Sequence, residues 1–115
     1  MSVNPDALRL RDMLNRAERI VHYLEGKTQS DLNQDSKLQD AVLHCFLILG
    51  EAAAQITAET KTRYPQFPWR SMIGIRNHIV HGYTQIDLEV IWQTASDDLP
   101  SLILELFKIV PPEHI

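Results

Sequence analysis

Apolar residues recur at steps of three and four along most of the chain, the spacing that places them on one face of a helix. In the first such segment these positions are Leu10, Leu14, Ala17, Val21 and Leu24. Asn4 can cap the start of this helix, Pro5 suits its first turn, and Gly26 suits the residue after its end. The pattern therefore predicts a helix over residues 5–25, followed by a polar link through Asn33.

The second helical segment is apolar around most of its circumference, which is typical of a helix that is central or lies in a subunit interface. Its main stripe comprises Leu38, Val42, Cys45, Leu49, Ala52 and Ile56. Gly50 interrupts this helix, and together with the alanines at 52–54 it would let another helix approach closely. Pro65 and Pro68 are expected to end the segment.

Two further helices follow. The third should begin at Pro68 and end at Gly82, and Asp87 can cap a fourth. The apolar stripe of that fourth helix comprises Trp92, Ala95, Leu99, Leu102, Leu106 and Ile109. Because this stripe keeps its phase through Pro100, we expect one continuous helix that is kinked there and lacks the backbone hydrogen bond to Ser96.

No segment alternates apolar and polar residues with the period of a strand. The predicted fold class is therefore all-α: an antiparallel bundle of four to five helices in one domain over residues 1–115. A composition of 44% hydrophobic and 23% charged residues is ordinary globular usage and excludes a disordered or fibrous chain. No signal peptide or membrane-length apolar run is evident, and Cys45 has no disulfide partner, so we expect a cytoplasmic protein.

The net charge of −4, taken alone, argues against a nucleic-acid partner, but the distribution of charge along the chain leads to a different interpretation. Between residues 60 and 86 there is no Asp or Glu. That window contains Lys61, Arg63, Arg70, Arg76, His78 and His81. A surface without constraint would mix both signs, so the window indicates an anion-facing surface. A second basic cluster lies among acidic residues and is explained by a solvated helical face: Arg9, Arg11, Arg16 and Arg19.

The third predicted helix and the residues just after it contain the candidate catalytic side chains. Arg76 is followed after four residues by His81, and His81 is followed after one residue by Tyr83. This spacing resembles the R-x4-H-x-Y signature of HepT-like toxins, a branch of the HEPN ribonuclease superfamily. The resemblance spans roughly residues 8–106. It includes Gly50-Glu51-Ala52, Trp69, Asn77, Ile79-Val80, Gly82, Trp92 and Asp98-Leu99-Pro100.

The resemblance implies a HEPN-like bundle and a metal-independent endoribonuclease that needs no cofactor. It also implies a homodimer, with possible higher assembly, whose signature residues line a cleft between subunits. The family's partner is a nucleotidyltransferase antitoxin of the MntA type, which silences the toxin by adenylylating the signature tyrosine. Carried over residue by residue, Arg76 and His81 would be catalytic, Asn77 would support them, and Tyr83 would be the modified residue.

These residue types also suit RNA cleavage on chemical grounds. When the RNA 2′-hydroxyl attacks the adjacent phosphate, His81 can move protons near neutral pH, and Arg76 can stabilise the charge on the phosphorane. Arg70 and His78 are candidate RNA-binding residues. Five residues at about 100° each separate Arg76 from His81 by about 140° around an ideal helix. Either the long Arg side chain bridges this gap or, as we prefer, two copies of the motif face each other across a two-fold axis.

Two other functions remain open. The same basic surface could belong to a non-catalytic helical adaptor that holds a nucleotide or the nucleotidyltransferase partner. The other is a purely structural helical bundle, which would require the absence of Asp and Glu from residues 60–86 to be due to chance.

Some other residues have simpler explanations. His78 and His81, with His44, are weak evidence for a metal site because no carboxylate or thiolate accompanies them, so we predict no metal ligand. Glu51 interrupts an apolar helix and should need a buried partner, most simply an arginine. Cys45 is interpreted as a small core residue.

Overall fold

The structure is a computed structural model, and it describes residues 5–82 and 84–110. Within these residues all regular secondary structure is helical, which confirms the predicted all-α class. The helices are α1 (Pro5–Leu24), α2 (Gln29–Gln34), α3 (Ser36–Gln55), α4 (Ala58–Arg63), α5 (Trp69–His81), α6 (Leu88–Asp97) and α7 (Leu99–Ile109). Five of them have ten residues or more and form the bundle, whereas α2 and α4 are six-residue connecting helices.

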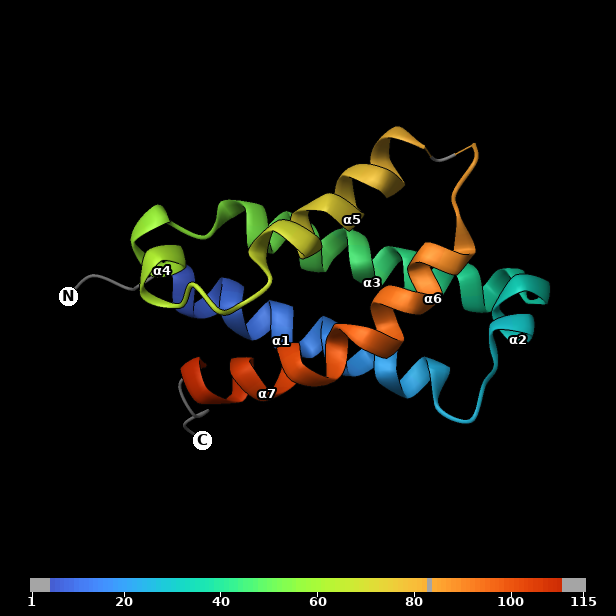
Figure 1. Cartoon of the computed structure of the whole chain (residues 1–115), viewed down its shortest axis with the longest axis horizontal. Coiled ribbons are helices and arrows are strands. Elements are labelled where there is room, and N and C mark those ends of the chain that lie inside the picture. The colour runs from blue at the N-terminus through green and yellow to red at the C-terminus, as the bar shows by residue number, and fades with distance from the viewer. Residues whose placement is uncertain (1–4, 83, 111–115) are drawn as a thin grey trace.

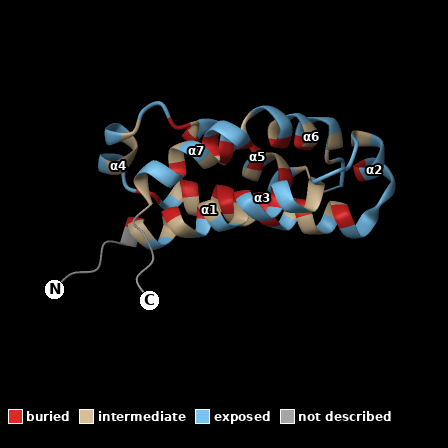
Figure 2. Cartoon of the chain, turned by 90° about the horizontal axis from the view of Figure 1, so that it is seen from below, coloured by how far each residue is buried: buried red, intermediate tan, exposed pale blue. Residues whose placement is uncertain are grey.

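Helix α3 is the centre of the bundle. It packs along α1 on one side and α5 on another, while α7 packs against α1 (Figure 1). Helices α1 and α3 run antiparallel, and α7 returns beside α1 in the opposite direction (Figure 1). Buried residues line the inner faces of the long helices, and exposed residues cover the outside (Figure 2). The apolar stripes predicted for residues 5–25 and for residues 38–56 therefore lie on helices that pack against each other.

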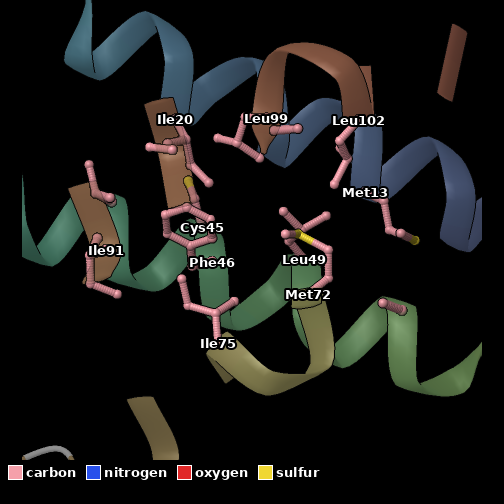
Figure 3. Close-up of a cluster of buried hydrophobic side chains, with 14 of the residues drawn as sticks. Met13, Ile20, Cys45, Phe46, Leu49, Met72, Ile75, Ile91, Leu99 and Leu102 are labelled. Carbon is pink, nitrogen blue, oxygen red and sulfur yellow. The ribbon is translucent and has the colours of Figure 1, made fainter. Parts of the chain in front are cut away.

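The core draws on every long helix. Figure 3 shows side chains from α1, α3, α5, α6 and α7 meeting in one cluster. Its labelled members are Met13, Ile20, Cys45, Phe46, Leu49, Met72, Ile75, Ile91, Leu99 and Leu102. Cys45 is 2% exposed, which confirms its interpretation as a core residue. Among the described residues, no helix is long and apolar enough to span a membrane.

The first connection differs from the polar link that the sequence predicted. Helix α1 ends at Leu24, and Gly26 follows with a positive φ of 72°, the conformation that glycine adopts at little cost. Thr28 then caps the short helix α2: its hydroxyl accepts from the Asp31 N–H, and the Asp31 carboxylate accepts from the Thr28 N–H. This capping box supports a helix that has no long apolar stripe.

Helix α3 ends well before the two prolines that were expected to stop it. Its last residue is Gln55, and Ile56 is extended. Thr57 then begins α4 by accepting a hydrogen bond from the Thr60 N–H. Asp6 of α1 fixes this corner, because its carboxylate accepts from the Thr57 N–H at 3.2 Å and from the hydroxyls of Thr57 and Thr60 at 2.6 Å each.

The expected continuous helix through Pro100 is two helices that meet at Asp98. The Asp98 N–H still donates to the Thr94 carbonyl at the end of α6, and the Leu102 N–H donates to the Asp98 carbonyl at the start of α7. Pro100 therefore lies in the first turn of α7, where its missing N–H removes no helical hydrogen bond. The apolar stripe keeps its phase because only one residue separates the two helices.

Candidate functional site

Helix α5 carries the Arg76–His81 motif and is anchored firmly at its start. The Trp69 indole N–H donates to the Tyr64 carbonyl at 2.9 Å, and the rings of Phe67 and Trp69 lie 4.3 Å apart. The Ser71 hydroxyl donates to the Asp98 carboxylate at 3.0 Å, which joins α5 to the α6–α7 junction. The core-facing side of α5 is formed by Trp69, Met72, Ile75 and Ile79. The rest of the helix is available to present polar groups.

The closest approach in the site is between Gly50 of α3 and Arg76 of α5. A Cβ added at Gly50 would collide with the Arg76 Cβ and lie 2.7 Å from the Met72 carbonyl oxygen. Only a hydrogen atom fits in that space. The expectation that Gly50 lets another helix approach closely is confirmed, and the helix concerned carries the predicted catalytic arginine.

The Arg76 guanidinium is held by a carboxylate from α3. Its Nη1 lies 3.5 Å from Glu51 Oε1. The predicted arginine partner of Glu51 is therefore confirmed, but Glu51 is not buried: its side chain is 45% exposed, and that of Arg76 is 24% exposed. The Arg76 Nε is buried without a hydrogen-bond partner among the described residues. Although residues 60–86 contain no carboxylate, the fold brings one to Arg76 from a different helix.

Asn77, His81 and Arg70 share the outer face of α5. Asn77 and His81 are four residues apart, and Arg70 is seven residues before Asn77, so all three fall on one side of the helix. All three residues are exposed. Helix α5 is unbroken between residues 76 and 81, so Arg76 lies about 140° away from His81, turned toward α3. Within one chain the structure groups His81 with Asn77 and Arg70, and groups Arg76 with Glu51.

His78 has a partner that the sequence did not reveal. Its Nε2 accepts a hydrogen bond from the Asp87 N–H at 3.1 Å, which ties α5 to the first residue before α6. Asp87 caps α6 as predicted, because its carboxylate accepts from the N–H groups of Glu89 and Val90. His78 was predicted to bind RNA, and in this structure one of its two ring nitrogens is already engaged. Tyr83, the predicted modified residue, lies outside the described residues.

Gly74 is a second feature of the outer face that the sequence reasoning missed. It lies in the middle of α5, is exposed, and a Cβ added there would meet no atom within 4 Å. The signal was available in the sequence, since glycine is unfavourable in the middle of a helix. Across residues 5–82 and 84–110, no group of three or more His, Cys, Asp and Glu side chains is placed to hold a metal ion.

Comparisons with known proteins agree with the motif. The family model described as ribonuclease HepT-like matches residues 13–109. A "Probable ribonuclease HepT" from Thermococcus cleftensis is 34% identical over 93 residues, covering 81% of this chain and 84% of its own. A "Putative RNase" from Methanocaldococcus jannaschii is 30% identical over 101 residues, covering 88% of this chain and 84% of its own. No solved structure matches significantly. The chain therefore belongs to the HepT-like ribonuclease family.

Proposed function

We propose that this protein is the toxin of a toxin–antitoxin pair and acts as an endoribonuclease that needs no metal. The observation that carries this proposal is the arrangement on α5, which presents a partly exposed guanidinium and an exposed imidazole from one rigid helix. Membership of the HepT-like family and the ribonuclease names of its relatives support it. We place its action in the cytoplasm, where RNA is available.

The proposed reaction uses the RNA's own 2′-hydroxyl as nucleophile. The 2′-oxygen forms a bond to the adjacent phosphorus while its proton passes to the imidazole of His81, acting as general base. The bond from phosphorus to the 5′-oxygen then breaks, and that oxygen takes up a proton. The products are a 2′,3′-cyclic phosphate and a free 5′-hydroxyl. Arg76 supplies a permanent positive charge for the extra negative charge that develops on the phosphorane oxygens.

We propose that the active unit is a homodimer. Arg76 and His81 lie about 140° apart around α5, so one chain does not direct both groups at one phosphate without a long reach by Arg76. A two-fold axis beside α5 would let His81 and Asn77 of one copy face Arg76 of the other, with Arg70 and His78 at the borders of the cleft. Higher assembly is compatible with this arrangement.

The proposed regulator is a nucleotidyltransferase antitoxin of the MntA type that adenylylates Tyr83. The phenol oxygen would attack the α-phosphorus of ATP, lose its proton and release pyrophosphate. Tyr83 follows His81 by two residues, so the added phosphate would lie near the imidazole and compete with RNA for the same positive groups.

The test is cleavage of a labelled single-stranded RNA by purified protein in the presence of EDTA. The wild type should cut it, and Arg76→Ala and His81→Ala should each lower the rate at least 100-fold while circular dichroism and dimer mass stay unchanged. A 2′-deoxyribose at the cut position should block the reaction. Absence of cleavage by unmodified wild type, or cleavage that requires added metal, would refute the mechanism. Toxicity without any cleavage would favour the non-catalytic adaptor.

A further inference from the structure

Helix α7 has a second apolar face that the core does not use. Its buried residues are Leu99, Leu102 and Leu106. Another set has the spacing of three, four and seven residues that aligns side chains on a different side of the helix: Pro100, Ile103, Leu104 and Phe107. Leu104 is 63% exposed and Phe107 is 59% exposed. Apolar side chains gathered on a surface are typical of a contact with another molecule.

This face borders a groove between α1 and the α6–α7 pair. Two hollows, of about 220 Å³ and 300 Å³, lie along the groove, and Val21 and Glu25 line both of them. The first hollow continues over Trp92 and Pro100, and the second over Ile103. Helix α5 packs on α3, whereas α7 packs on α1, so the groove and the motif helix lie on different sides of the bundle (Figure 1).

The polar edge of this groove is acidic. Glu18 lies on α1 and Glu25 directly follows the end of that helix, about two turns or 10 Å further along the axis. His22 is the only basic residue that lines these two hollows, and its Nδ1 lies 3.8 Å from a Glu25 carboxylate oxygen. Arg11, two turns before Glu18, lines neither hollow. Such an edge attracts Lys and Arg and repels nucleic acids and anionic lipid headgroups.

A second copy of the chain does not suit the two hollows. A two-fold axis over Val21 would set Glu18 of one copy against Glu25 of the other if the two α1 helices are antiparallel. If the helices are parallel, each glutamate would face its own counterpart. Both arrangements bring carboxylates together and remove them from water, which disfavours the contact.

We propose that the groove between α1 and the α6–α7 pair binds a helix of another protein, one that has an apolar face and Lys or Arg along its edge. Two successive hollows suit a helix, because its apolar side chains three, four and seven residues apart would enter them in turn. Basic residues seven positions apart would pair with Glu18 and Glu25, which have the same spacing. This inference does not depend on the proposed ribonuclease function.

The test uses a fluorescein-labelled synthetic peptide of about 14 residues, or four helical turns. Leu residues three and four positions apart form its apolar face, Lys residues seven positions apart lie along the edge, and Ala fills the other positions. A comparison peptide has Glu in place of each Lys. Fluorescence anisotropy should show saturable binding of the Lys peptide to the full chain, weakened by added salt, and no binding of the Glu peptide.

Two substitutions of matched exposure test the apolar part of the groove. Val21→Gln changes the side chain that lines both hollows, and Val90→Gln is the control, since Val21 is 44% exposed and Val90 is 40% exposed. We expect Val21→Gln to weaken binding of the Lys peptide about fivefold and Val90→Gln to leave it unchanged. Unchanged affinity in Val21→Gln would overturn the inference, as would equal affinity for the two peptides or no binding of either.

The acidic edge is tested by removing two charges at once. The double variant Glu18→Gln with Glu25→Gln should weaken binding of the Lys peptide about fivefold. Asp12→Asn with Asp40→Asn removes the same charge from exposed positions outside the groove and should have no effect.

RNA cleavage should be the same in all of these variants, so failure of this inference leaves the proposed function standing. A changed oligomeric mass in a groove variant would assign the groove to a contact between copies of the chain. A loss of RNA affinity in Val21→Gln would assign the groove to RNA. Either result would overturn the inference.

Discussion

Glu51 Oε1 lies 3.5 Å from Arg76 Nη1, so the arginine that the motif marks as catalytic is held by the helix that forms the centre of the bundle. The pair is partly exposed, and its contribution to stability should stay below about 1 kcal/mol. Its larger effect should be on orientation, since the Arg76 Nε has no partner of its own among the described residues.

Replacing Glu51 should therefore change catalysis more than folding. For Glu51→Ala we expect kcat to fall about tenfold because Arg76 loses its fixed orientation, whereas KM should stay level or fall because a negative charge near RNA is removed. Glu51→Gln, which keeps the shape and loses the charge, should retain more of kcat. Steady-state cleavage kinetics with a urea unfolding curve for each variant check this. Equal kcat in the wild type and Glu51→Ala would show that the ion pair does not position Arg76.

Alanine at Gly50 should have the opposite effect on stability from alanine at Gly74. At Gly50 the new methyl group would meet the Arg76 Cβ and the Met72 carbonyl, so α3 and α5 must separate. Overpacking of this kind costs about 1–3 kcal/mol. Urea unfolding should show the loss for Gly50→Ala and a gain for Gly74→Ala. A neutral Gly50→Ala would mean that the two helices are not in tight contact here.

The Asp6 carboxylate should make stability depend on pH in the acid range. Burial raises the pKa of Asp6, but the hydrogen bonds from Thr57 and Thr60 and the charge of Arg9 outweigh it, so the pKa is lowered from its ordinary 3.8. A lowered pKa stabilises the fold fully above that ordinary value, and the contribution is lost as the pH falls through the folded pKa.

Asp6→Asn should reduce stability at pH 7 by about 2 kcal/mol, because a neutral amide accepts these bonds more weakly and directs an N–H group at their donors. The difference from the wild type should shrink between pH 4 and pH 2. Asp12→Asn, at an exposed position on the same helix, should show neither effect. Thermal unfolding across this pH range measures both. A constant difference down to pH 2 would contradict the assignment.

His78 offers a direct comparison between RNA contact and helix anchoring. Because its Nε2 accepts the Asp87 N–H, His78→Gln can place an amide oxygen near the same position, whereas His78→Ala cannot. We expect Ala to lose about 1 kcal/mol of stability and Gln to lose less. RNA cleavage by the Gln variant should stay within threefold of the wild type. A large loss of RNA affinity in both variants at unchanged stability would instead support the predicted RNA contact.

The proposed adenylylation of Tyr83 can be tested by measuring the intact mass of the protein. Co-expression with a nucleotidyltransferase of the proposed MntA type should add AMP to the wild type, which intact mass spectrometry detects, and should abolish RNA cleavage. Tyr83→Phe should remain unmodified and keep its cleavage activity in the presence of the antitoxin. Unchanged modification of Tyr83→Phe would assign the AMP to a different residue.

The long helices could be predicted because their signals are local. Apolar spacing fixes the buried face of α3, Gly26 ends α1, and Asp87 caps α6, and each of these signals lies within a few residues of its effect. The short helices α2 and α4 were missed because six residues do not show a periodic stripe. Their caps, Thr28 and Thr57, were the available signals.

The sequence predicted the helix that carries the candidate site residues, but it did not predict their contacts with other helices. The sequence placed Arg76, Asn77 and His81 on one helix, and the fold does so. The engagement of His78 by Asp87 depends on how the chain returns between α5 and α6, which no local pattern specifies. The break at Asp98 was likewise hidden, because a one-residue interruption leaves the apolar phase intact.

Arg76 and His81 lie on different sides of α5, and this separation affects how activity depends on the amount of the protein in the cell. If cleavage requires groups from two copies, the amount of active enzyme at low expression rises with the square of the number of chains. A cell making a few molecules would then remain unharmed, and a small failure of the antitoxin supply would produce a sharp onset of growth arrest.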